Sequence, residues 1–138
     1  LWERFPNHGE NPYTCNYKNG KLEGPWRDYH YHGEEKLVGN FKNGKREGLW
    51  KWYDLDHVLW KRGNYKDGKK DGLWQGFYKN GQLEYRKNYK DGKLDGLWER
   101  FGDNGQLEFR RVDMRSLGVD KKMDTKENTF RTNPVTVD

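Results

Sequence analysis

The chain has 138 residues, enough for a single domain, of which 36% are charged, and its formal net charge is +5. With 12 Leu, 6 Val, 6 Phe and no Ile or Ala, a thick aliphatic core is excluded, and no apolar run is long enough to span a membrane. The 7 Trp, 9 Tyr and 6 Phe residues can hold a thin fold together, because each ring buries roughly 150–250 Å².

A 24-residue repeat organises the sequence from its first residue onwards. The repeated columns are Trp2, Trp26, Trp50, Trp74 and Trp98; Phe5, Tyr29, Tyr53, Phe77 and Phe101; Tyr17, Phe41, Tyr65 and Tyr89; Gly20, Gly44, Gly68 and Gly92; and Gly24, Gly48, Gly72 and Gly96. The register fails at Asp113 and Ser116. We therefore assign residues 1–112 to a repeat array of about five units, the first one truncated. Residues 113–138 form a C-terminal tail that either caps the array or is partly disordered.

Each unit begins with a strand that leads into a first turn, and a second strand leads into a second turn. The first turn carries Asn-Gly at 43–44 and Asp-Gly at 67–68 and 91–92, which are strong hairpin signals. The second turn carries Asn-Gly at 80–81 and 104–105, but Asp54-Leu55-Asp56-His57-Val58 stands in this slot of the third unit. Between the turns lie stretches of about six to eight residues, the length of a strand.

The side-chain pattern of these strands predicts a sheet with one polar face. Leu83, Tyr85, Lys87 and Tyr89 alternate with polar residues, which is typical of a strand that is wet on one side. In residues 49–53, Trp50 and Trp52 share one face but Tyr53 lies on the other, so we expect either a bulge or a second covered surface. The predicted fold is all-β: tandem antiparallel hairpins in an elongated, twisted, single-sheet ribbon.

The consensus of the unit resembles a known repeat. It reads Tyr/Phe-Lys-Asn/Asp-Gly-Lys-x-Glu/Asp-Gly-Leu-Trp-x-x-Tyr/Phe, as in residues 41–53 and 65–77. This is similar to MORN repeats, and more closely to the bacterial MORN variant of YwqK-type antitoxins. The resemblance implies no catalytic chemistry. It implies a binding module, and for the variant family a protein that neutralises a toxin made by a neighbouring gene.

Isolated Cys and His residues are the candidates for catalysis or metal binding. Cys15 stands in a column otherwise filled by Gly, Lys or Arg and has no predicted base beside it, so we interpret it as a small strand residue. His30 and His32 would share a strand face, but His32 occupies a turn slot before Gly33. We therefore expect no enzyme activity, no catalytic residues, no metal and no cofactor.

The aromatic residues around the third unit are the candidate partner-binding surface. The Trp column either forms the core or lines a groove that receives a partner. Trp52 and Trp60 lie outside that column and flank the unusual 54–58 turn, so the repeat itself does not require them. The predicted partner-binding residues are Trp50, Trp52, Tyr53, Asp54, Asp56, His57, Trp60 and Trp74.

Charged residues recur beside the first turn of each unit. We expect Glu23, Glu47, Asp71 and Asp95 to accept hydrogen bonds from turn amides or to pair with lysines. Lys42, Lys45, Lys66, Lys69, Lys90 and Lys93 would form rows along one sheet edge. These rows are either a solvated edge that blocks aggregation or a surface for an anionic partner. The charge excess is modest, so we expect no nucleic acid.

The leading hypothesis is a non-enzymatic antitoxin or immunity protein that sterically occludes a cognate bacterial toxin. The alternative is a MORN scaffold that is peripheral to anionic membranes through its lysine rows. The single cysteine excludes an intramolecular disulfide and favours the cytoplasm. A periplasmic or lipid-anchored protein is the alternative, because residue 1 already lies inside a repeat. The oligomeric state stays open.

Overall fold

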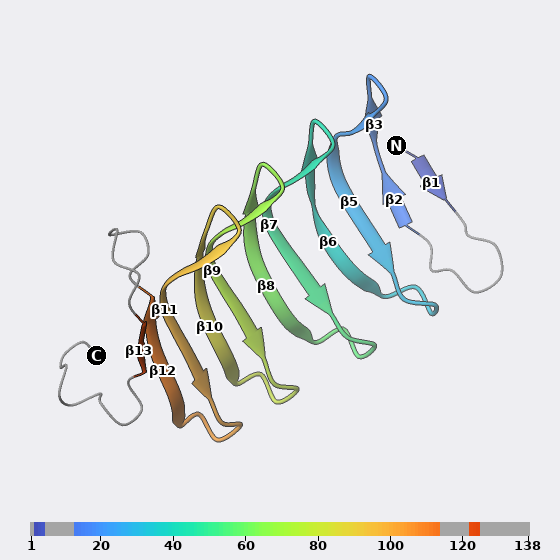
Figure 1. The fold of residues 1–138 in the computed structure, drawn as a ribbon. Coiled ribbons are helices and arrows are strands. Elements are labelled where there is room, and N and C mark those ends of the chain that lie inside the picture. Colours follow the sequence, from blue (N-terminus) through green and yellow to red (C-terminus); the bar gives the residue numbers. More distant parts are fainter. Residues whose placement is uncertain (1, 5–12, 114–121, 125–138) are drawn as a thin grey trace.

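The computed structural model describes residues 2–4, 13–113 and 122–124 (Figure 1). All regular elements in this part of the chain are β-strands, and it contains no helix with the length and apolarity needed to cross a bilayer. The strands are β1 (Trp2–Arg4), β2 (Tyr13–Cys15), β3 (Tyr17–Lys18), β4 (Lys21–Leu22), β5 (Gly24–Tyr29), β6 (Glu35–Lys42), β7 (Lys45–Tyr53), β8 (Leu59–Lys66), β9 (Lys69–Phe77), β10 (Leu83–Lys90), β11 (Lys93–Phe101), β12 (Leu107–Asp113) and β13 (Lys122–Asp124).

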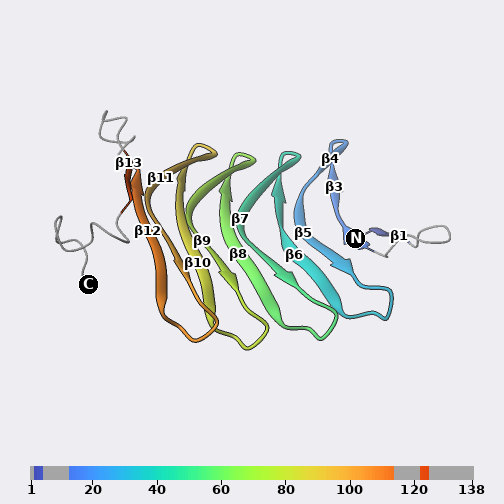
Figure 2. The same cartoon turned by 60° about the horizontal axis from the view of Figure 1, so that its bottom comes forward.

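The strands form an antiparallel ribbon in which each strand lies beside its neighbours in the sequence. An 11-stranded sheet has the order β1-β2-β5-β6-β7-β8-β9-β10-β11-β12-β13, and β3 and β4 pair as a small separate hairpin. Figures 1 and 2 show these hairpins following one another along a single axis. The predicted all-β array of tandem hairpins is confirmed.

The last strand of the sheet, β13, comes from residues beyond the last repeat column. Asp113, the first residue assigned to the tail, is the final residue of β12 and is buried. Strand β13 pairs antiparallel with β12 through partners that include Val112 and Met123. The rest of the proposed tail, residues 114–121 and 125–138, lies outside the described residues.

A bulge bends each of the long hairpins. In β6 and β7 the pairing shifts between Val38 and Asn40, which leaves extra residues on β7 around Gly48. Gly48 has a φ of +74°, which glycine adopts without a steric penalty. The indole N–H of Trp50 donates to the Asn40 carbonyl at 3.2 Å, so the tryptophan caps a backbone group at the bulge. Of the two alternatives for residues 49–53, the bulge is confirmed; Figure 2 shows the resulting curvature of the strands.

Two tryptophans form the centre of the core. Trp50 is 0% exposed and Trp74 is 1% exposed. Each ring lies flat on a glycine of the preceding strand: a Cβ added to Gly39 would lie 2.1 Å from the Trp50 ring, and one added to Gly63 would lie 2.0 Å from the Trp74 ring. Phe41, beyond the bulge, meets Trp50 edge to face with ring centroids 5.2 Å apart. The core interpretation of the Trp column therefore holds for these two rings.

The flanking tryptophans are less buried: Trp98 pairs with Lys87 and Arg111, whereas Trp26 pairs with Gly39. Trp98 is half-buried, and its strand partner Lys87 places Nζ 4.8 Å from the ring centroid. Trp26, also half-buried, stacks on Tyr13 at 4.8 Å. The two fully buried indoles, Trp50 and Trp74, are those that occupy the space left by a glycine of the preceding strand.

Hydrogen bonds join successive units along the edge formed by the first turns. The amide of Gly68 donates to the Arg46 carbonyl at 3.0 Å, and Gly44 and Gly92 make the equivalent bonds to the preceding units. Glu23 accepts from the amide of Asn43 at 3.0 Å, and Glu47 accepts from the amide of Asp67 at 3.1 Å. The prediction that these repeated carboxylates bind turn amides is confirmed for Glu23 and Glu47.

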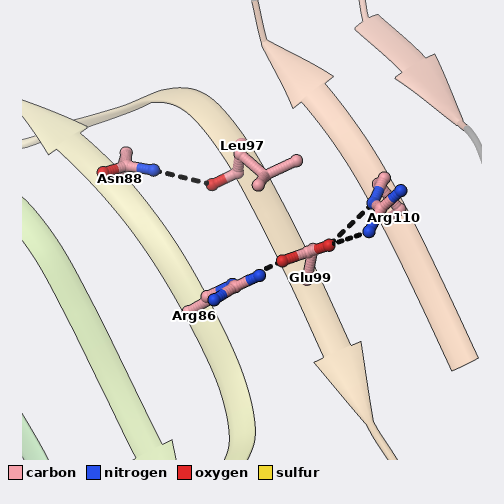
Figure 3. A network of polar contacts seen from close by, with 5 residues as sticks. All are labelled: Arg86, Asn88, Leu97, Glu99 and Arg110. Carbon is pink, nitrogen blue, oxygen red and sulfur yellow. Dashed lines mark hydrogen bonds and ion pairs between the residues drawn. The ribbon is translucent and has the colours of Figure 1, made fainter. Parts of the chain in front are cut away.

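The face of the sheet opposite to the tryptophans carries a row of polar side chains that crosses five strands. Glu99 on β11 is fully buried between two arginines: Arg86 Nε donates to Oε1 at 2.5 Å, and Arg110 Nε donates to Oε2 at 2.7 Å (Figure 3). The row continues to β9 and β8, where Arg62 donates to Gln75 at 2.8 Å. These side chains lie directly opposite one another in the strand register, so the row ties neighbouring units together.

Candidate functional site

The unusual 54–58 segment keeps the same backbone turn as the other units. The amide of Asp54 donates to the Val58 carbonyl and the amide of His57 donates to the Asp54 carbonyl, both at 3.0 Å. The turn that begins at Tyr78 makes the same two bonds with Gln82 and Gly81. The change of sequence therefore alters the side chains that the turn presents and leaves its backbone pattern intact.

The side chain of Asp54 accepts hydrogen bonds from turn amides, as an asparagine side chain does in the neighbouring turns. Its Oδ1 accepts hydrogen bonds from the amides of Asp56 and Val58, each at 2.9 Å. The bond from Val58 is the main cause of a pKa below the usual value for the Asp54 carboxyl. An ionised carboxylate at this position thus stabilises the turn that carries the predicted site.

His57 occupies the position at which other units have glycine. Its φ is +58°, in the left-handed region that a side chain disfavours. The imidazole stacks on Tyr53 with ring centroids 4.6 Å apart and planes 10° apart. The stacked ring compensates for part of the backbone strain and fixes the Tyr53 side chain beside the turn.

We expect His57→Gly to leave the free energy of unfolding within about 1 kcal/mol of its original value, because relief of strain offsets the lost stacking. His57→Val should destabilise the fold by about 2 kcal/mol, since a β-branched residue fits poorly at positive φ. Urea unfolding followed by tryptophan fluorescence measures both variants. Equal stability of the Gly and Val variants would contradict the assigned backbone conformation.

A second bulge directs Trp60. Tyr53 pairs with Leu59 and Trp52 pairs with Lys61, which leaves Trp60 as the extra residue of β8. Bulges commonly redirect a side chain in this way. Trp60 is 43% exposed, although it is a large aromatic residue. The same slot holds Lys36, Glu84 and Glu108 in the other units, so the repeat does not require an apolar side chain there.

The two off-column tryptophans meet at a cavity of about 460 Å³ beside the 54–58 turn. Its apolar lining consists of Trp52, Tyr53, Leu55 and Trp60. Its polar lining consists of His30, Lys36, Asp54, Asp56 and Lys79. Binding cavities of this size usually combine apolar walls with a few polar groups that orient the ligand.

Side chains from three successive units build this cavity. His30 Nε2 lies 3.0 Å from the Tyr53 carbonyl oxygen, and Lys79 Nζ donates to Asp56 Oδ2 at 2.7 Å. The bond to Asp56 is the main cause of a raised pKa for the exposed Lys79 ammonium. The aromatic walls are thus flanked by an exposed ion pair on one side and by a histidine that anchors the preceding unit on the other.

Of the eight predicted partner-binding residues, five line the cavity: Trp52, Tyr53, Asp54, Asp56 and Trp60. His57 lies behind them, stacked on Tyr53. The burial of Trp50 and Trp74 leaves them no ring surface for a partner in this conformation, because their indoles serve the core. Sequence reasoning missed Leu55, which lies in the 54–58 turn itself, and His30, Lys36 and Lys79, which reach the cavity from the flanking units.

The predicted lysine rows lie along the edge formed by the first turns. Lys42, Lys45, Lys66, Lys69, Lys90 and Lys93 are all exposed. The aliphatic stem of Lys45 covers the turn of the next unit, since a Cβ added to Gly68 would lie 3.6 Å from the Lys45 Cβ. Lys69 relates to Gly92 in the same way. The stems therefore pack on the turns while the ammonium groups reach water.

The isolated Cys and His residues, Cys15, His30 and His32, take part in the fold itself. Cys15 is a buried free thiol on β2. His30 bonds the Tyr53 carbonyl, and the ring of His32 lies edge-on to Tyr31 at 5.7 Å. Among the described residues, no three His, Cys, Asp or Glu side chains lie close enough to hold a metal ion.

A set of basic residues lies on the aromatic face, where sequence reasoning did not look for a site. Lys61 Nζ is 4.4 Å from the Trp52 ring centroid and Lys70 Nζ is 4.7 Å from that of Trp74. The alternation of residues 83–89 already placed Lys87 on the apolar face, which was the available signal. Cations over aromatic rings contribute about 0.5–1 kcal/mol each, so these lysines also stabilise the face that they cover.

Comparison with known proteins finds a similar repeat in part of the chain. Residues 46–67, 70–91 and 94–111 match the family model of the MORN repeat variant. No curated protein matches the chain. A solved structure titled "Crystal Structure of TarM" is similar over 84% of this chain and 21% of that chain, with 14% sequence identity and a TM-score of 0.46. MORN repeats are generally modules that bind proteins or membranes.

Proposed function

We propose that this protein is a non-enzymatic binding module that acts as an antitoxin or immunity protein. In this mechanism, the surface around Trp52 and Trp60 docks on a cognate toxin and covers its active site. The observation that carries the proposal is the aromatic cavity beside the 54–58 turn, whose walls the repeat does not need. The similarity of three units to the MORN repeat variant supports a binding role.

The exposure of the cavity walls is costly unless a partner covers them. Trp60 is 43% exposed and Leu55 is 63% exposed, and both border the same hollow. Buried tryptophans in central pockets are the residues that most often dominate protein interfaces, at about 2 kcal/mol or more each. A side chain of the toxin that enters this hollow would bury Trp60 and Leu55 together.

Co-expression with the product of the neighbouring gene tests this proposal. We expect that product to be toxic alone, to be tolerated together with this protein, and to co-purify with it. Trp60→Glu, which copies the residue of the next unit, should weaken the complex at least tenfold while leaving the thermal unfolding temperature nearly unchanged. The matched control is Leu49→Glu, at a residue that is also 43% exposed but lies outside the cavity lining.

The antitoxin proposal fails if no neighbouring product is toxic or if none co-purifies. The assignment of the docking surface fails if Trp60→Glu and Leu49→Glu weaken the complex equally.

The second candidate function is a scaffold at anionic membranes. The six exposed lysines along the edge formed by the first turns favour it, since each basic residue near an anionic surface contributes about 1 kcal/mol. Flotation with vesicles that contain phosphatidylserine tests this function at low and high salt. Binding that is lost at high salt, and lost when Lys42, Lys66 and Lys90 are replaced by Gln, would favour the scaffold. Indifference to lipid would exclude it.

A further inference from the structure

Each strand from β7 to β12 places one cationic side chain on the aromatic face. These side chains are Arg46, Lys61, Lys70, Lys87, Arg100 and Arg111. The strand register puts them there: Lys61 pairs with Trp52, and Lys87 pairs with both Trp74 and Trp98. Over residues 37–111, the described strand positions that share this face hold no Asp or Glu. We call these six residues the basic face.

The positive charges of the basic face act on one another. Burial is the largest cause of a lowered pKa for Lys61, and the charges of Lys70 and Arg46 add to it. Burial, Lys70 and Arg100 likewise lower the pKa of Lys87, and the carboxylate of Glu84 offsets part of this effect. An anionic ligand on this face would therefore relieve an existing repulsion between cations.

The cations are held in defined places by the rings beneath them. The guanidinium carbon of Arg46 is 4.6 Å from the Trp50 ring centroid, and that of Arg111 is 5.6 Å from the Trp98 centroid. Arg46 and Lys70 hold equivalent positions two strands apart, which corresponds to about 9.5 Å. A ligand with several anionic groups along its length can thus meet several fixed cations together.

The geometry disfavours the other polyanions. Single-stranded nucleic acid binds by stacking successive bases on successive open rings, but Trp50 and Trp74 are buried beneath Arg46 and Lys70, and Trp60 is the exposed ring beside this face. A bilayer is flat, whereas Lys61, Lys70 and Lys87 of the basic face are half-buried. A flat surface would meet the exposed lysines of the turns first.

We propose that the basic face receives a segment of the partner protein that is rich in Asp and Glu, with Lys61 and Lys87 as its central contacts. This inference rests on the proposed protein-binding function and names the chemistry of the partner. The segment binds through its carboxylates, while the aromatic cavity beside Trp60 anchors an apolar side chain of the same partner. The two contacts belong to one continuous surface, because Lys61 Nζ lies 5.3 Å from the Trp60 ring centroid.

Fluorescence anisotropy with a labelled oligoglutamate peptide tests the basic face without any knowledge of the toxin. The double variant Lys61→Gln, Lys87→Gln should bind the peptide about tenfold more weakly at low ionic strength. The control variant Lys42→Gln, Lys66→Gln removes the same charge from the exposed turns and should change affinity less than twofold. Lys61→Arg with Lys87→Arg should restore binding and show that the fold tolerates substitution at both sites.

Parallel titrations use an oligothymidylate strand and phosphatidylserine vesicles as competing probes. Tighter binding of either probe than of oligoglutamate would overturn the inference, as would equal losses in the two Gln variants or no peptide binding at all. If oligoglutamate binds as expected but no neighbouring product co-purifies, only the antitoxin function fails. If a toxin co-purifies and its affinity survives the Lys61 and Lys87 replacements, only this inference fails.

Discussion

Gly63→Ala is expected to lower the free energy of unfolding by about 3 kcal/mol, the upper end of the usual cost of overpacking. The new Cβ would lie 2.0, 2.3 and 2.5 Å from atoms of the Trp74 ring, closer than any real contact. Trp74 cannot move aside easily, because its indole donates to the Asn64 carbonyl at 3.0 Å and its ring meets Tyr65 edge to face at 5.1 Å. Urea unfolding followed by tryptophan fluorescence measures the loss.

Gly72→Ala is the matched control in the same unit. Gly72 has no neighbouring atom within 4 Å of an added Cβ, but its φ is +76°. The cost there is backbone strain alone, about 1 kcal/mol. The assigned packing of the core would be contradicted if the two Ala variants lost the same stability. It would be supported further if Trp74→Leu reduced the additional cost of Gly63→Ala.

Glu99→Ala is expected to destabilise the fold by about 3 kcal/mol, because it removes the common partner of two arginines at a buried position. Arg110 is the main source of the loss, since its side chain is only 14% exposed and would lose the carboxylate that accepts from its Nε. Arg86 is 43% exposed and can turn towards water. Thermal and urea unfolding both report the change.

Gln75→Ala provides the comparison for Glu99→Ala, because Gln75 holds the equivalent position on β9 and accepts from Arg62. A neutral acceptor contributes less, so we expect a loss of about 1 kcal/mol. Glu99→Gln should fall between the two Ala variants. A loss for Glu99→Ala no larger than that for Gln75→Ala would show that the buried carboxylate makes no special contribution.

The repeat made the fold predictable from the sequence. Columns of Gly, Trp and Tyr or Phe at a fixed step report the turns and the strands directly, because turn conformation and strand alternation depend on neighbouring residues. The same locality explains the correct role assigned to Glu23 and Glu47, which bind the turn amides of the next unit.

The candidate site was predictable only in part. Trp52 and Trp60 were recognisable because they break the columns, but the cavity also needs His30 and Lys79 from the flanking units, and their approach depends on the bend of the sheet. The bulge that directs Trp60 has no signal in its own residues. The burial of Glu99 likewise depends on arginines of two other strands, which a single strand pattern does not reveal.

The basic face shows a different limit. Lys61 and Lys87 read as exceptions within an apolar pattern, and only the register shows that both extend over rings of neighbouring strands. These charges are half-buried against the rings, whereas the lysine rows at the edge are exposed. A basic residue on an otherwise apolar strand face is therefore as useful a signal of a binding surface as an off-column tryptophan.

The bonds between successive turns have a consequence for how such a chain can evolve. Gly44, Gly68 and Gly92 each bond the unit before them in the same way, so every unit offers its successor the same backbone acceptor. An in-frame duplication of one unit in the gene would find its hydrogen-bonding sites ready and would lengthen the ribbon by two strands, about 9.6 Å. The number of units would then set the distance between the regions that contact a partner, while the chemistry of each unit stays unchanged.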